Sequence, residues 1–92
     1  MDKNEAFGML CEQITDTHKR KSHDYGDSFG QMWERFGITS AVIRLSDKMN
    51  RVYTLTSGKS AEVKDESLRD TLLDLASYAI MTVVEMDKEK GN

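Results

Sequence analysis

The chain has 92 residues, of which 38% are hydrophobic and 32% charged, and its net charge at pH 7 is −3. This length fits one domain, residues 1–92, with a limited core, and the charge does not indicate a nucleic-acid partner held by bulk positive charge. No apolar run reaches the ~18–20 residues that cross a bilayer, and no signal-peptide pattern opens the chain. The single cysteine, Cys11, predicts a reduced thiol in a cytoplasmic protein. The absence of proline predicts a helical fold.

The first predicted helix covers roughly residues 4–20. Phe7, Leu10 and Ile14 recur at spacings of three and four, which places them on one face of a helix. A polar loop is expected over residues 21–30, reading KSHDYGDSFG, because glycines and polar residues interrupt the periodicity. A short helical turn over residues 31–36 follows.

Two further helices are predicted, over roughly 41–55 and 64–88, with a side-chain cap at Thr39 or Ser40. One apolar face of the earlier helix carries Val42, Leu45, Met49, Val52 and Tyr53. The last helix has a stripe of Leu68, Leu72, Leu75, Ala79, Val83 and Met86. Its second half is hydrophobic nearly all round, so we expect an all-α bundle completed by a homodimer or homotetramer.

Three carboxylates follow one edge of the last helix at intervals of four residues: Glu66, Asp70 and Asp74. Like charges at this spacing repel by a few tenths of a kcal/mol per pair, so the row is either a solvated face or a site for a hard cation. Mg²⁺ prefers oxygen ligands, commonly one or two carboxylates together with substrate phosphates. Asp47 on the neighbouring helix is a candidate third ligand, and Mn²⁺ is an alternative metal.

Cationic side chains accompany these carboxylates. Arg44, Lys48 and Arg51 share a helix with Asp47, and they can neutralise phosphate, arginine by bidentate contact and lysine as a point charge. The simpler interpretation is that Arg44 and Arg51 pair with Asp47 on the surface.

The predicted loop contains Asp24, Tyr25 and Asp27. Tyr25 either stacks on a nucleobase or packs as a lid over the core. The aspartates are either ligands or turn formers that accept hydrogen bonds from nearby backbone amides. The two histidines lack partners at zinc-like spacing, and no P-loop or nucleophile motif is present.

Three blocks of the sequence, KSHDYGDSF, IRLSDKMNR and DESLRDTLLDLASYAIM, together resemble the nucleotide modification associated domain family, small domains common in bacteria and their phages. The resemblance spans roughly Lys19–Met86. The last block is also similar to the acidic helix of the MazG-like, all-alpha nucleoside triphosphate pyrophosphohydrolases. This second resemblance implies a MazG-like bundle in which acidic helices hold Mg²⁺ against a triphosphate.

The MazG-like resemblance assigns roles to particular residues. Asp70 matches the final aspartate of the second acidic motif, Glu66 the acidic residue one turn earlier, and Asp47 the first acidic position of the earlier motif. Lys48 and Arg51 stand where further glutamates are expected. The implied metal ligands and catalytic residues are Asp47, Glu66 and Asp70. From the loop, the cations and the carboxylate row described above, the candidate substrate-binding residues are Asp24, Tyr25, Arg44, Lys48, Arg51 and Asp74.

Two functions are consistent with these features. The first is Mg²⁺-dependent hydrolysis of a nucleoside triphosphate to the monophosphate and pyrophosphate. The alternative is a non-catalytic module of a nucleotide modification system that binds nucleotide or nucleic acid. The cations at positions 48 and 51 favour the alternative, because they replace negative charge that a metal site needs.

Overall fold

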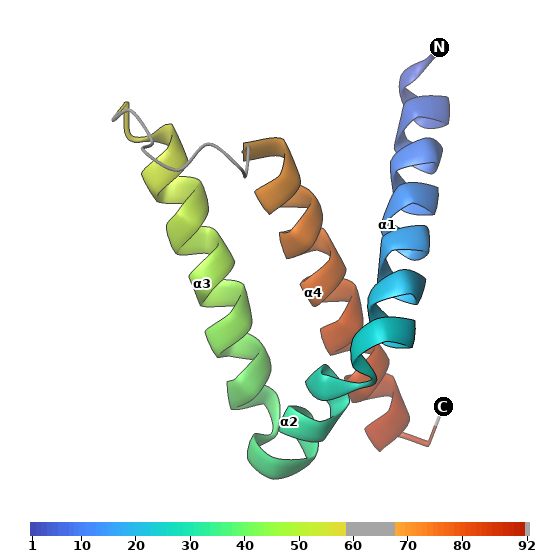
Figure 1. The fold of residues 1–92 in the computed structure, drawn as a ribbon, viewed down its shortest axis with the longest axis vertical. Coiled ribbons are helices and arrows are strands. Elements are labelled where there is room, and N and C mark those ends of the chain that lie inside the picture. Colours follow the sequence, from blue (N-terminus) through green and yellow to red (C-terminus); the bar gives the residue numbers. More distant parts are fainter. Residues whose placement is uncertain (59–67, 92) are drawn as a thin grey trace.

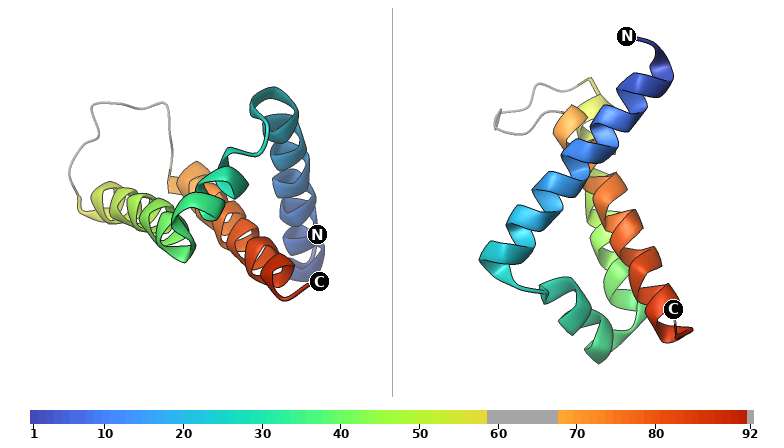
Figure 2. Two further views of the ribbon diagram at one scale, coloured as in Figure 1. Left: turned by 90° about the horizontal axis from the view of Figure 1, so that it is seen from below. Right: turned by 90° about the vertical axis from the view of Figure 1, so that its right-hand side faces the viewer.

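The computed structural model describes residues 1–58 and 68–91, and most of these residues are helical. The helices are α1 (Lys3–Tyr25), α2 (Ser28–Phe36), α3 (Ile38–Thr56) and α4 (Leu68–Glu89) (Figure 1). The prediction of an all-α protein is therefore confirmed. α3 and α4 run antiparallel, α1 lies on the other side of α4, and α2 crosses one end of the bundle (Figure 2).

α1 is longer than the sequence predicted, and the expected polar loop over residues 21–30 is wrong for most of its length. The helix continues through Tyr25, and Gly26, with φ of 72°, ends it while donating its N–H to the Ser22 carbonyl at 2.9 Å. Asp27 then caps α2 by accepting the Gly30 N–H at 2.9 Å. A glycine stop directly before an aspartate cap reduces the connection to two residues.

The start of α1 is capped in the same way. The Asp2 carboxylate accepts the Glu5 N–H at 2.8 Å. This hydrogen bond lowers the pKa of the Asp2 carboxyl, because it favours the charged form.

α3 begins three residues earlier than predicted, and its expected side-chain cap is wrong. Gly37, with φ of 63°, reverses the chain and donates its N–H to the Trp33 carbonyl at 2.7 Å. This conformation suits glycine and lets α3 start at once. Ser40 already lies inside the helix, where its hydroxyl donates to the Gly37 carbonyl at 2.8 Å. The last helix was predicted over residues 64–88; the part before Leu68 lies outside the described residues.

The described residues bury few hydrophobic side chains, namely Trp33 and Ala41. Trp33 also donates its indole N–H to Glu89 Oε1 at 2.5 Å, which joins α2 to the last turn of α4. Thr71 and Thr82 are buried on the side of α4 that packs within the chain. The internal side of α4 is thus partly polar.

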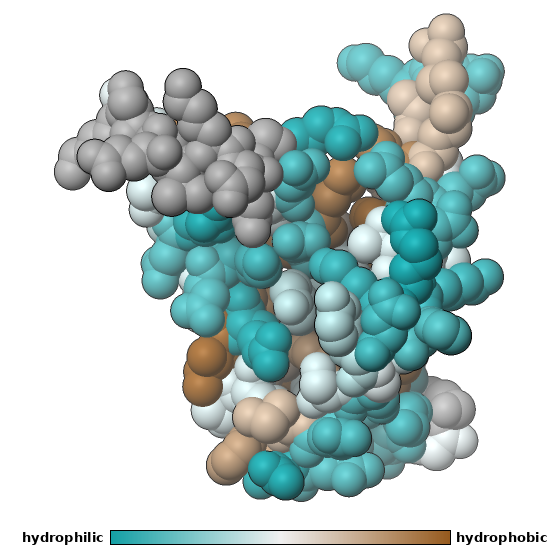
Figure 3. All heavy atoms as spheres, viewed as in Figure 1, coloured by the Kyte–Doolittle hydropathy of each residue, from teal (hydrophilic) through white to brown (hydrophobic). Residues whose placement is uncertain are grey.

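The predicted apolar faces are largely exposed. Val42 and Tyr53 of α3 and Leu72 and Val83 of α4 all lie at the surface. On the face shown in Figure 3 hydrophilic residues predominate, and hydrophobic atoms show beside the start of α3 and between α4 and α1. Within the described part of the chain, no helix combines the length and the hydropathy needed to cross a membrane.

Candidate functional site

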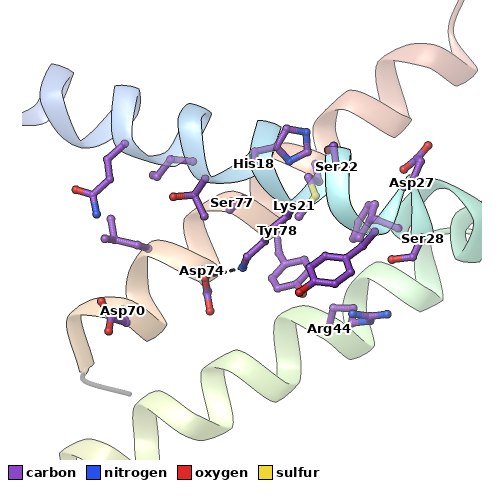
Figure 4. Close-up of a pocket in the computed structure, with 18 residues that line it drawn as sticks. His18, Lys21, Ser22, Asp27, Ser28, Arg44, Asp70, Asp74, Ser77 and Tyr78 are labelled. Atoms are coloured by element: carbon purple, nitrogen blue, oxygen red, sulfur yellow. Dashed lines mark ion pairs between the residues drawn. The ribbon is translucent and has the colours of Figure 1, made fainter. Parts of the chain in front are cut away.

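A cleft of about 340 Å³ lies between α1 and α4, at the junction of α1 with α2 (Figure 4). Its volume falls within the roughly 300–1000 Å³ typical of small-molecule sites. α1 contributes Lys21, Ser22 and Tyr25, and α3 contributes Arg44. The polar residues of α4 in the cleft are Asp70, Asp74, Ser77 and Tyr78.

Asp74 connects three helices through two lysines. Its Oδ1 lies 3.8 Å from Lys21 Nζ on α1, and its Oδ2 lies 3.3 Å from Lys48 Nζ on α3. The Lys48 contact is also a hydrogen bond, and the Lys48 side chain is 24% exposed, against 60% for Lys21. Two ammonium groups share one carboxylate, so one positive charge is not balanced within this cluster.

Two cationic side chains lie over the Tyr78 ring. Arg44 Cζ lies 6.0 Å and Lys48 Nζ 5.8 Å from the ring centroid, within the range of cation–π attraction. Phe29 packs beside the same ring, with centroids 6.1 Å apart. These contacts hold Arg44 in the cleft beside Tyr78, whose ring also lies against Lys48 of the Asp74 cluster.

The other carboxylates of the cleft lie away from this cluster. Asp70 is one helical turn before Asp74, and Asp27 is at the opposite end of the cleft (Figure 4). Asp27 is already engaged as the cap of α2. The cluster of Lys21, Lys48 and Asp74 therefore carries one excess positive charge, whereas the cleft as a whole has charges of both signs.

Four of the residues predicted for the site line the cleft: Tyr25, Arg44, Asp70 and Asp74. Lys48 joins them through its bond to Asp74.

The remaining predicted residues lie elsewhere. Asp24 is exposed outside the cleft, where it contacts His23 Nδ1 at 3.1 Å. Asp47 is exposed on α3 and Arg51 is half-buried there, and neither is among the described lining residues. Glu66 lies outside the described residues.

The structure does not test the metal prediction, because that prediction depends on Glu66. Across residues 1–58 and 68–91, no group of three or more histidine, cysteine or carboxylate side chains is placed to hold a metal ion. The predicted set of Asp47, Glu66 and Asp70 includes one residue beyond these ranges. Asp74 is a poor additional ligand in this arrangement, since two lysines already neutralise it.

Sequence reasoning did not predict Lys21, Ser22 or Tyr78 as residues of this cleft. A usable signal was present, because Ile14, His18, Lys21 and Tyr25 follow one another at spacings of three or four. The assumption of a loop from residue 21 concealed this continuation of the helical face.

The described residues form a small all-α domain with an aromatic-lined cleft that carries charges of both signs. A sequence model of the family described as nucleotide modification associated domain 1 matches residues 21–86, and the chain belongs to this family. No significant match was found among curated proteins or among solved structures. The similarity to MazG-like enzymes stays a prediction from the sequence.

Proposed function

We propose that the cleft between α1 and α4 binds a nucleotide through its phosphate groups. The observation that carries this proposal is the pairing of Lys21 and Lys48 with the single carboxylate of Asp74, with Arg44 held beside Tyr78 in the same cleft. A phosphate that enters the cluster meets positive charge already held in position, so it needs little rearrangement of the protein. Family membership supports a nucleotide as the ligand.

The remaining lining residues suit the other parts of a nucleotide. Ser22 and Ser77 offer hydroxyl groups that donate to phosphate or accept from a sugar. Tyr25 is 77% exposed and lines the cleft, where its ring can stack on a base. Such stacking contributes roughly 1–3 kcal/mol for each base.

Hydrolysis of a nucleoside triphosphate to the monophosphate and pyrophosphate is the second candidate function, favoured by Asp70 lining the same cleft. Mg²⁺ or Mn²⁺ would supply Lewis-acid polarisation of a phosphoryl oxygen and activation of water. Asp70 would hold the metal, with Asp47 and Glu66 as the further carboxylates. Arg44 and Lys48 would offset the negative charge of the phosphates.

The biological setting follows the same proposal. The chain would act in a bacterial or phage nucleotide modification system, in the cytoplasm and as a homo-oligomer. The non-catalytic alternative differs only in the absence of turnover, and a nucleic acid carrying the same phosphates would then be a possible partner.

Calorimetric titration with nucleoside mono- and triphosphates tests the binding proposal. Replacing Arg44 by Ala is expected to raise the dissociation constant about 10- to 100-fold, because a charge-assisted contact is removed. Lys19→Gln is the matched control, since Lys19 is exposed on α1 and is not among the lining residues. Absence of binding by the wild-type protein would overturn the proposal.

Pyrophosphate release distinguishes catalysis from binding. The wild type is compared with Asp70→Asn in the presence of Mg²⁺ or Mn²⁺. Release that disappears in Asp70→Asn supports the pyrophosphohydrolase. Binding without release from any nucleotide supports the non-catalytic module.

A further inference from the structure

α4 directs an almost entirely apolar side away from the rest of the chain. Leu72, Ile80, Val83 and Val84 are between 46% and 54% exposed. At 3.6 residues per turn, Ile80, Val83 and Val84 lie roughly opposite the buried Thr71 and Thr82, and Leu72 lies at the edge of the same side. The outer side of α4, from Arg69 to Asp87, therefore resembles the face of a helix that packs against a neighbour.

The chain exposes more surface than a compact monomer of its length. Its accessible surface is 7271 Å², whereas a compact monomer of this size exposes roughly 5400 Å². A stable protein–protein interface buries about 800 Å² per partner. The excess is large enough for such an interface.

Opposite charges stand at the two ends of the apolar side. Asp87 follows Arg69 by 18 positions, which is five complete helical turns, or about 27 Å. Both residues therefore point in the same direction from the helix axis, and both are exposed. Neither takes part in an ion pair among the described residues.

We propose that this side of α4 binds the same side of α4 in a second copy of the chain, in an antiparallel pair with twofold symmetry. A twofold axis at the level of residue 78 places Arg69 of one copy opposite Asp87 of the other, twice. Leu72 then meets Val84, and Ala76 meets Ile80. A small residue near the axis lets the two helices approach closely.

The arrangement fits a second copy better than an unrelated partner. The surface is self-complementary, since in an antiparallel pair Arg69 of each copy lies opposite Asp87 of the other. A parallel copy would instead place Arg69 beside Arg69 and Asp87 beside Asp87. Asp70 and Asp74 point about 100° or more away from Arg69 and Asp87 around α4, so the pair leaves these two carboxylates of the cleft open, while Leu73 and Ser77 lie at its border.

Charge reversal at the two ends provides the sharpest test. Analytical ultracentrifugation of the full chain should show a dimer in the wild type. Arg69→Asp and Asp87→Arg should each raise the dissociation constant of the dimer about tenfold, because the twofold symmetry makes each substitution disrupt two exposed ion pairs. The double variant should regain the wild-type dissociation constant. Glu34→Arg on α2, an exposed position outside the surface, is the control and should leave the dimer unchanged.

Ile80→Glu is a second variant, which places a charge at the centre of the contact. It should yield monomer, or unfolded chain if the dimer is needed for folding, and circular dichroism separates these two supporting outcomes. A monomeric wild type would overturn the proposal. The proposal would also be overturned if the dimer persisted in Ile80→Glu and in both charge reversals. The dimer contact would then be sought on the side of α3 that carries Val42 and Tyr53.

Discussion

At the scale of single residues, Asp74 is the centre of the cleft because it holds Lys21 and Lys48 at once. A phosphate must share these lysines with the carboxylate. Asp74 therefore competes with an anionic ligand while it keeps the lysines in position. Variants of Asp74 and of Tyr25 distinguish the contribution of charge to ligand binding from the contribution of the aromatic ring.

Replacing Asp74 by Asn is expected to tighten pyrophosphate binding several-fold, because a competing negative charge is removed. The free energy of unfolding should fall by no more than about 1 kcal/mol, since these ion pairs are partly solvated. Calorimetry and thermal denaturation measure the two effects. Asp16→Asn on the exposed part of α1 is the control, and weaker binding by Asp74→Asn would mean that the carboxylate itself contacts the ligand.

Tyr25→Ala is expected to weaken nucleotide binding by roughly 5- to 100-fold, the range for loss of one stacked base. Pyrophosphate has no base, so its binding should not change. The exposed side chain supports no core, and the melting temperature should stay near that of the wild type. Equal losses for both ligands would place Tyr25 at the phosphates rather than at the base.

At the scale of elements, two glycines within helices have opposite roles. Gly30 is buried, and a Cβ there would collide with the Asp27 carboxylate that caps α2. Gly8 lies in α1 with nothing within 4 Å of an added Cβ. The same substitution should therefore have opposite effects on stability at the two positions.

Gly30→Ala should lower the free energy of unfolding by about 1–2 kcal/mol, since the lost cap and the steric conflict outweigh the gain in helix propensity. Gly8→Ala should raise it by roughly 0.5–1 kcal/mol, because alanine reduces the freedom of the unfolded chain. Chemical denaturation of both variants measures the difference. Stabilisation by Gly30→Ala would show that Asp27 can move aside without cost.

The sequence was informative about elements and less so about their ends and facing sides. Periodicity correctly predicted helices in each region, but a glycine followed by aspartate was interpreted as part of a long loop, although it separates two helices. The side of α3 with Val42 and Tyr53 was expected to form the core. In the structure Leu45, Met49 and Val52 of that face are half-buried, Val42 and Tyr53 are exposed, and Ala41 is the buried residue of α3. A helix with apolar residues on more than one side does not reveal which side packs within its own chain.

The site was predictable to the extent that its residues were charged and regularly spaced. Arg44, Asp70 and Asp74 were identified in this way. Lys21 and Tyr78 were not, because their importance arises only where α1 and α4 approach each other.

At the scale of the whole molecule, stability should depend on protein concentration. The buried hydrophobic residues among those described are few, and association through α4 would stabilise the folded state by mass action. The melting temperature should rise by several degrees for a hundredfold increase in concentration, as measured by circular dichroism. A concentration-independent midpoint would mean that the single chain folds unaided.

The indole of Trp33 gives this protein a built-in optical reporter. It is the one tryptophan of the chain, it is buried, and it is bonded to Glu89. Its fluorescence therefore describes a single location, where α2 rests on the end of α4. Phe29 contacts both Trp33 and Tyr78, with ring centroids 6.5 and 6.1 Å apart, so this location adjoins the wall of the cleft. Titrating a ligand while following tryptophan emission would read the cleft without any attached dye.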